Sequence, residues 1–141
     1  MPDFLGGMEA LDMLLEQSNH VCLALPATAE TSRLMNLPRL QKMQQGAYLY
    51  NVGRGSAIDE QAIVQVLQDG HLGGAGLDVF EQEPLSADSP LWKLPNVWIT
   101  PHVSGVTPHY YKRFADLFIA DLHRFHAGAD PENTYNPSLG Y

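Results

Sequence analysis

The chain has 141 residues, of which 45% are hydrophobic and 17% are charged, a composition typical of a folded globular protein rather than a disordered one. This length is enough for a single domain with one hydrophobic core. The formal net charge is -8, and the eight Lys and Arg residues are scattered along the sequence. Such an acidic chain lacks the basic stripe expected of a nucleic-acid-binding protein, so we predict no nucleic-acid partner.

No apolar run is long enough to span a membrane, and residues 1–4 lack the basic and apolar regions of a signal peptide. We therefore expect a cytoplasmic protein that does not associate with membranes. Cys22 is the only cysteine, which excludes disulfides within the chain and Cys-based zinc sites. Because it lies in an apolar run, we interpret Cys22 as a small buried residue.

The first part of the sequence alternates helix-length segments with short apolar runs. Leucines at helical spacing predict a helix at residues 8–17, and a strand is expected at residues 20–25. A second, weaker helix at residues 37–44 precedes a second strand at residues 47–52. This order of elements is typical of a parallel sheet with crossover helices.

The pattern continues through the second part of the sequence. Asp59 can cap a third helix, which we expect to end at the Asp-Gly pair of residues 69–70. Further strands are predicted at residues 74–79 and 97–100. A Thr-Pro pair then marks the start of a long amphipathic helix at about residues 108–126.

Together these elements predict an α/β fold, a partial doubly wound (Rossmann-like) parallel sheet with flanking helices. Most strands are apolar at consecutive positions, so we expect them to be covered on both faces. The chain opens with a helix that feeds a strand, which indicates that the first βαβ unit is missing. Residues 127–141 are rich in Pro, Asn and Gly and predict an extended tail. An uncovered sheet edge and such a tail favour a homo-oligomer or a complementing N-terminal chain.

Arg54 follows the second predicted strand, at the edge where α/β sheets bind ligands. A guanidinium there can hold a 2-oxo acid through two parallel hydrogen bonds and overcome the repulsion between an acidic surface and a carboxylate. An ordinary surface arginine in a glycine-rich turn is the alternative. Gly53-x-Gly55 with Asp78 at the next strand end also partly resembles a dinucleotide fingerprint. Ile58 occupies the third glycine position, however, which argues against a phosphate loop.

Carboxylates follow the third strand, and a histidine follows the fourth. Asp78, Glu81 and Glu83 lie close together in sequence, and His102 comes directly after an apolar run. A carboxylate beside an imidazole orients the ring and stabilises its charged form, so such a pair can exchange a proton with a substrate hydroxyl. A solvated acidic loop is the alternative for the carboxylates alone. With Arg54, these groups reach one sheet edge, as carbonyl reduction with a nicotinamide requires.

Two other kinds of site are disfavoured. His123 and His126 lie one turn apart on a helix face but lack further ligands nearby in sequence, so no metal is predicted. Ser104 is two residues from His102 and no nucleophile elbow is present, which argues against a hydrolase.

Several motifs resemble those of the D-isomer-specific 2-hydroxyacid dehydrogenase family, and within it those of glyoxylate/hydroxypyruvate reductases. The motifs are LPAT with ET at residues 25–31, NVGRG at 51–55, GLDVF through EP at 76–84, SPLW at 89–92 and TPHVSG at 100–105. The resemblance implies that residues 1–126 are the C-terminal part of an NAD(P)-binding domain, followed by the tail at 127–141.

The resemblance also implies roles for individual residues. Arg54 would bind the 2-oxo acid, His102 would donate and accept the proton, and Glu83 would pair with His102, leaving Glu81 a bystander. The implied cofactor is NAD or NADP, and the implied substrate is a small 2-oxo or 2-hydroxy acid such as glyoxylate or hydroxypyruvate. The implied cofactor contacts are Pro26 and Thr31 on the adenosine and phosphate side, Asp78 at the nicotinamide carboxamide, and Val52, Gly53 and Gly105 bordering the nicotinamide.

The sequence departs from the family pattern at one important point. It contains no strand followed by Gly-x-Gly-x-x-Gly and no substrate-domain segment. The loop that holds the pyrophosphate at a helix N-terminus is therefore absent, as is the residue that separates NAD from NADP. Two alternatives to an independent enzyme stay open. One is a non-catalytic, nucleotide-dependent binding module, since the family includes corepressors, and the other is a truncated inactive fragment.

Overall fold

The computed structural model describes residues 4–132 and 134–138. The chain divides into two compact units, Met1–His102 and Val103–Tyr141. We describe each unit by itself. The extent of the nucleotide-binding part inferred from the sequence, residues 1–126, stays a prediction.

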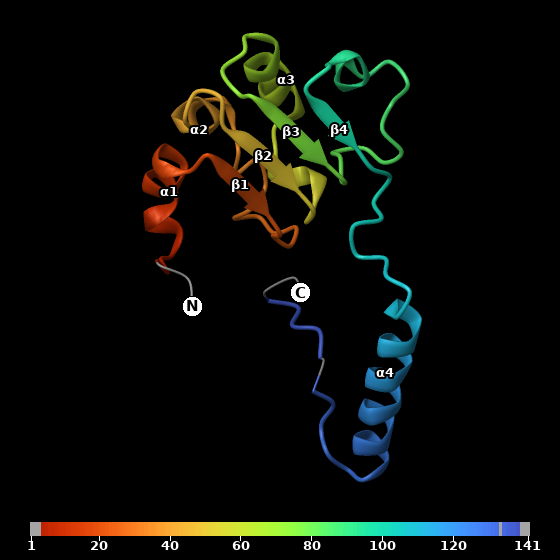
Figure 1. Ribbon diagram of the computed structural model, residues 1–141. Coiled ribbons are helices and arrows are strands. Elements are labelled where there is room, and N and C mark those ends of the chain that lie inside the picture. The colour runs from red at the N-terminus through yellow and green to blue at the C-terminus, as the bar shows by residue number, and fades with distance from the viewer. Residues whose placement is uncertain (1–3, 133, 139–141) are drawn as a thin grey trace. The chain divides into compact units, whose positions relative to one another are not determined.

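A four-stranded parallel sheet forms the centre of the first unit, with the strands in the order β1-β2-β3-β4 (Figure 1). The strands are β1 (His20–Leu23), β2 (Tyr48–Asn51), β3 (Gly74–Leu77) and β4 (Val97–Ile99). All four lie inside the predicted ranges, so the α/β fold with a parallel sheet is confirmed. Each strand ends slightly earlier than predicted, because the chain leaves the sheet there to form the loops that carry the polar residues.

Three helices form a layer on one face of this sheet. They are α1 (Leu11–Gln17), which a 3-10 turn precedes, α2 (Leu37–Lys42) and α3 (Glu60–Gln68). Helix α2 contacts α1 on one side and α3 on the other (Figure 1). Because each strand pairs with the next one in sequence and parallel crossovers are right-handed, the successive helices lie on the same face.

The bounds of α3 agree with the local sequence signals. The Asp59 side chain accepts hydrogen bonds from the backbone N–H groups of Gln61 and Ala62, both at 3.1 Å. Gly70 follows the helix with φ at +70°, a conformation that favours glycine. The predicted cap and the predicted end of this helix are both confirmed.

The two faces of the sheet differ in burial. On the face that packs against the helices, Leu49, Ala75 and Leu77 are buried. On the other face Cys22 is exposed and Trp98 is 64% exposed. The expectation that both faces are covered, and with it the interpretation of Cys22 as buried, is therefore wrong for the described residues. The reason is that α1, α2 and α3 all cover the same face. The apolar runs in the sequence predict a strand but do not show which of its faces is covered.

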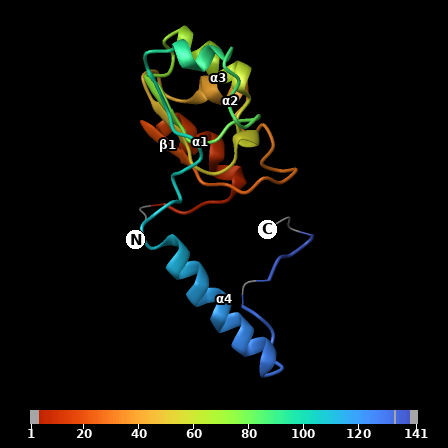
Figure 2. The same cartoon turned by 90° about the vertical axis from the view of Figure 1, so that its right-hand side faces the viewer.

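The second unit contains one long helix, α4 (Tyr110–His126), which runs without interruption (Figure 2). It begins later than predicted, because the N–H of Tyr110 donates to the carbonyl of Thr107 at 3.0 Å in a turn that precedes the helix. Thr107 is therefore not the cap. His109 occupies that position without a side-chain capping bond. The predicted end at His126 is confirmed, and α4 has no buried residue.

No helix in the described part of the chain is both long and apolar enough to cross a membrane.

Candidate functional site

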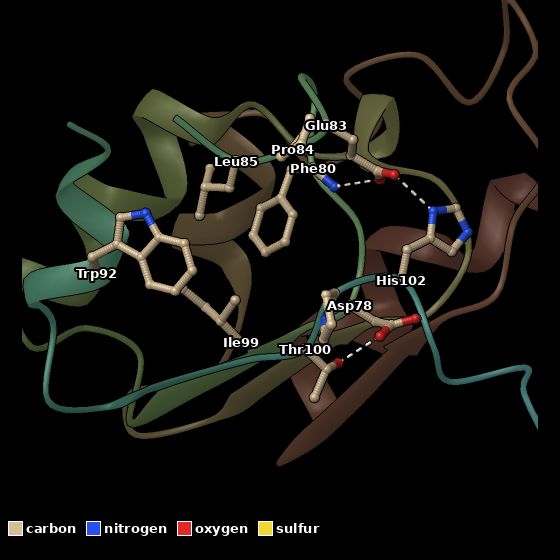
Figure 3. Close-up of a pocket in the computed structure, with 10 residues that line it drawn as sticks. Asp78, Phe80, Glu83, Pro84, Leu85, Trp92, Ile99, Thr100 and His102 are labelled. Atoms are coloured by element: carbon tan, nitrogen blue, oxygen red, sulfur yellow. Dashed lines mark hydrogen bonds and ion pairs between the residues drawn. The ribbon is translucent and has the colours of Figure 1, made fainter. Parts of the chain in front are cut away.

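His102 and Glu83 form a hydrogen-bonded pair beyond the ends of β3 and β4 (Figure 3). Nδ1 of His102 lies 2.7 Å from Oε2 of Glu83, and Oε1 of Glu83 accepts the backbone N–H of Phe80 at 3.0 Å. These two bonds hold the pKa of Glu83 below its usual range, and the bond with His102 has the larger effect. The positive charge of Arg54 lowers this pKa further. Glu83 is therefore ionised at neutral pH and can orient the imidazole.

The backbone of His102 has an uncommon conformation. Its φ is +55°, in the left-handed region that costs a non-glycine residue roughly 1–2 kcal/mol. Its N–H donates to the carbonyl of Asp78 at 2.8 Å, which ties the start of the following segment to the end of β3. In Figure 3 the second ring nitrogen, Nε2, points away from Glu83 and from Phe80. The Glu83 bond and the backbone bond thus fix the direction in which the imidazole is presented.

Asp78 is a buried carboxylate, with only 3% of its surface exposed. Its Oδ1 accepts the hydroxyl of Thr100 at 2.5 Å, and its backbone N–H donates to the carbonyl of Asn51 at 3.0 Å. Asp78 therefore joins β2, β3 and β4 at the edge of the sheet where the loops begin. A buried carboxylate is a strong acceptor for an amide or hydroxyl donor.

Arg54 lies in a loop that is packed between its neighbours. A Cβ on Gly53 would come within 2.6 Å of the backbone of Leu25, and one on Gly55 within 1.9 Å of the backbone of Phe80. Both positions therefore require glycine for close backbone contact. Arg54 itself is exposed, and its Nη1 donates to the carbonyl of Gly53 at 2.8 Å.

The loop after β1 contains the residues inferred for the adenosine and phosphate side. Thr31 donates through Oγ1 to the carbonyl of Pro26 at 2.6 Å and accepts the N–H of Thr28 at 2.9 Å. These bonds close the loop on itself. Val52 is 42% exposed, and its N–H donates to the carbonyl of Leu23, the last residue of β1, at 3.0 Å.

An open cavity of about 560 Å³ borders the His102–Glu83 pair (Figure 3). Asp78 and Thr100 also line it, and the rest of its wall is hydrophobic. The hydrophobic lining consists of Phe80, Pro84, Leu85, Trp92, Ile99 and Pro101.

Eight of the nine predicted site residues lie in the first unit, and three of them, Asp78, Glu83 and His102, line one cavity. Gly105 belongs to the second unit, where it lines a smaller cavity of about 230 Å³ with residues of α4, among them Arg113 and Phe114. Its predicted place beside a nicotinamide stays a prediction.

Sequence reasoning missed several residues that hold the site together. Glu81 does not pair with His102. Its N–H donates to Oε1 of Glu60 at 2.6 Å, and its carboxylate lies 3.4 Å from Nε of Arg33. Burial raises the pKa of Glu60, and the bond from the Glu81 N–H partly offsets that rise. Asn51 is the other omission. Its position as a polar residue at the end of an apolar strand is the one signal that could have revealed it.

Comparison with known protein families and sequences gives one consistent result. Residues 3–104 match the family described as D-isomer specific 2-hydroxyacid dehydrogenase, NAD binding domain. Over 130 residues the chain is 42% identical to glyoxylate/hydroxypyruvate reductase B of Yersinia enterocolitica. That match covers 92% of this chain and 40% of the reductase, so the chain spans about two fifths of its relative's length.

Solved structures of similar sequence have the same fold. A D-isomer specific 2-hydroxyacid dehydrogenase from Xanthobacter autotrophicus Py2, in complex with NADPH and MES, is 41% identical with a TM-score of 0.89. The match covers 96% of this chain and 55% of that one. An NADPH-dependent glyoxylate/hydroxypyruvate reductase from Sinorhizobium meliloti, in complex with NADP and sulfate, is 32% identical with a TM-score of 0.87. That match covers 95% of this chain and 43% of the reductase.

Proposed function

The chain belongs to the D-isomer specific 2-hydroxyacid dehydrogenase family, and we propose that it carries the substrate-orienting and proton-transfer residues for interconverting a small 2-oxo acid and its 2-hydroxy acid. The observation that carries this proposal is the 2.7 Å pair between His102 and Glu83. An imidazole oriented by an ionised carboxylate is the group that proton exchange with a carbonyl or hydroxyl oxygen needs.

Arg54 is the proposed anchor for the substrate carboxylate. Its side chain is exposed on a tightly packed loop, and its charge acts on Glu83, so it lies near the proposed proton donor. A guanidinium binds a carboxylate through two parallel hydrogen bonds and so fixes the orientation of the neighbouring carbonyl. Arg54 would also polarise that carbonyl for reduction.

His102 is the proposed proton donor in reduction and acceptor in oxidation. Protonated imidazole would donate from Nε2 to the carbonyl oxygen of the substrate as that oxygen gains negative charge. Glu83 would hold the ring through Nδ1 and stabilise its charged form. In the reverse direction neutral His102 would accept the hydroxyl proton.

The residues at the sheet edge fit a nicotinamide cofactor. Asp78 offers a buried carboxylate acceptor of the kind that a carboxamide N–H₂ group requires, and the exposed Val52 offers an apolar surface. When bound, NAD or NADP would supply or accept the hydride. Pro26, Thr31 and Gly53 would border the rest of the cofactor, and Gly105 is proposed on the nicotinamide side. NADP is favoured because two similar solved structures contain it or its reduced form.

Glyoxylate and hydroxypyruvate are the proposed substrates. The support comes from two relatives, at 42% and 32% identity, which are both named glyoxylate/hydroxypyruvate reductases. The sequence contains no Gly-x-Gly-x-x-Gly, so we propose that a complementing N-terminal chain supplies the phosphate-binding loop and completes the substrate site. A homo-oligomer and a cytoplasmic location remain predictions from the sequence.

The test is oxidation of NADPH and NADH by the purified chain with glyoxylate and with hydroxypyruvate, alongside calorimetric titration of each nucleotide. His102→Ala should abolish turnover, whereas His123→Ala, which removes an exposed histidine of α4, should leave it unchanged. Nucleotide binding without turnover would favour a binding module. No binding and no turnover, even with a complementing N-terminal chain, would refute the proposal.

A further inference from the structure

We propose that Asn51 is the positioning residue for Arg54: its buried amide sets the loop backbone from which the guanidinium is presented. This inference rests on the proposed role of Arg54 in binding the 2-oxo acid. Asn51 would not touch the substrate and would act through Arg54 alone.

Asn51 is the last residue of β2, with 0% of its surface exposed. It and Asp78 are the two polar residues buried in the part of the chain that the structure describes. Its Oδ1 accepts the N–H of Gly53 at 3.1 Å, and its Nδ2 donates to the carbonyl of Arg54 at 3.0 Å. Both ends of the amide therefore bind the backbone of the next three residues.

The burial of this amide has no evident benefit for the core. Leu49 occupies the equivalent inward-facing position earlier on β2 and is also fully buried. An apolar side chain at position 51 would avoid the desolvation that a buried amide incurs, a cost that its hydrogen bonds must offset. Since those bonds go to the Arg54 loop, the loop is where Asn51 exerts its effect.

The loop to which Asn51 is hydrogen-bonded, residues 52–54, determines the position of the Arg54 side chain. The exposed Arg54 side chain donates to the carbonyl of Gly53, and Asn51 holds the N–H of that same residue. The Asn51 carbonyl also accepts the N–H of Asp78 at 3.0 Å. One buried residue thus connects the proposed substrate anchor with the buried carboxylate on the neighbouring strand.

The experiment measures the binding of oxalate, a planar dianion that resembles a 2-oxo acid, by following the NMR shift of the Arg54 Nε–H group as oxalate is added. Asn51→Ala should weaken oxalate binding about tenfold, the order of loss expected when its two hydrogen bonds to the loop no longer orient the anchor. Asn51→Asp, which keeps the acceptor but places a second acceptor against the Arg54 carbonyl, should weaken it at least as much.

The matched control is Leu49→Val, which removes one methylene group from the same strand without touching the loop. It should lower the unfolding midpoint yet leave oxalate affinity within about twofold, the spread expected of independent sites. In an Arg54→Ala background, where oxalate binding is followed by calorimetry, Asn51→Ala should cause no further loss. Equal losses from Leu49→Val and Asn51→Ala, or unchanged binding in Asn51→Ala, would overturn the positioning role.

A second readout separates this inference from the proposed function. Hydrogen exchange of the Gly53 N–H should accelerate in Asn51→Ala and stay slow in Leu49→Val, whether or not oxalate binds. If the unaltered chain does not bind oxalate, even with a complementing N-terminal chain, the proposed role of Arg54 fails, and Asn51 then has no role in substrate binding. If hydrogen exchange of the Gly53 N–H is unaffected by Asn51→Ala, Asn51 does not hold the loop in place.

Discussion

At the scale of single residues, the site depends on a few polar groups whose surroundings restrict them strongly. His102 occupies a left-handed backbone conformation, and its ring is held by an exposed rather than a buried carboxylate. An exposed ion pair contributes little to stability, so the value of Glu83 to the protein lies mainly in orienting the imidazole. Glu83 should therefore affect the pH dependence of a reaction more than it affects folding.

Replacing Glu83 with Gln tests this expectation. If the chain is active in 2-oxo acid reduction, the alkaline limb of its pH–rate profile, where protonated His102 is lost, should move to lower pH, because a neutral amide stabilises charged imidazole less than a carboxylate does. The measurement is kcat/KM across pH, with Glu81→Gln as a control, since Glu81 lies on the same loop and does not pair with His102. Equal shifts in the two variants would contradict the assignment.

The same variant makes a prediction for stability. Folding lowers the pKa of Glu83, so its ionised form contributes stability above the ordinary glutamate value of about 4.3, and this contribution is lost as the pH falls through the folded-state pKa. Glu83→Gln should therefore unfold at slightly lower urea concentration at pH 7. The difference from the parent chain should shrink as the pH falls below about 4. If the stability difference between Glu83→Gln and the parent chain instead grows as the pH falls, folding raises the pKa of Glu83 and the prediction is wrong.

At the scale of elements, the loops after β1, β2 and β3 are fitted to one another by close backbone contacts. Gly53 lies against the loop after β1, Gly55 lies against Phe80, and the first turn of α3 reaches the β3 loop through Glu60. The start of α3 therefore both begins a helix and supports the segment that carries Glu83.

Removing the cap of α3 should destabilise the first unit. Asp59→Ala deletes the acceptor for two backbone N–H groups and should lower the free energy of unfolding by about 1 kcal/mol. Urea denaturation gives this value, and Asp88→Ala, at an exposed aspartate in a loop, serves as the control. Equal effects from the two variants would mean that net charge, not capping, is responsible.

At the scale of the whole molecule, the buried core belongs to one of the two units. All the buried hydrophobic residues of the described chain lie between Leu15 and Leu91, inside the first unit, while α4 has none. The first unit therefore contains the packing that a cooperative transition requires.

This distribution predicts the outcome of a truncation. A chain that ends at residue 106 should retain a cooperative thermal transition, with a midpoint within about 4–8 °C of the parent, the shift caused by roughly 1 kcal/mol in a domain of this size. Circular dichroism at 222 nm during heating measures it. Loss of the transition would show that residues 107–141 are needed to hold the first unit together.

The sequence by itself determined the order of the elements, the positions of the four strands and the bounds of α3. These features arise from interactions between near neighbours, such as the Asp59 cap, Gly70 and apolar spacing. It also identified Arg54 and His102 as polar residues directly after strands. It could not say which face of the sheet is covered or where α4 begins. Both depend on contacts or turn geometry that composition does not encode.

Only the tertiary structure decided which side chains meet. Glu81 and Glu83 are equivalent by type and neighbours in sequence, yet Glu83 pairs with His102 while Glu81 turns to Arg33. Cys22 is exposed although its segment is apolar, because the right-handed crossovers place α2 and α3 on the opposite face, where α1 packs beside α2. The buried amide of Asn51 likewise has a role that only the structure reveals, because its hydrogen bonds go to the backbone of Gly53 and Arg54. Local signals specify what each segment becomes, but the handedness and packing of distant segments specify what each residue touches.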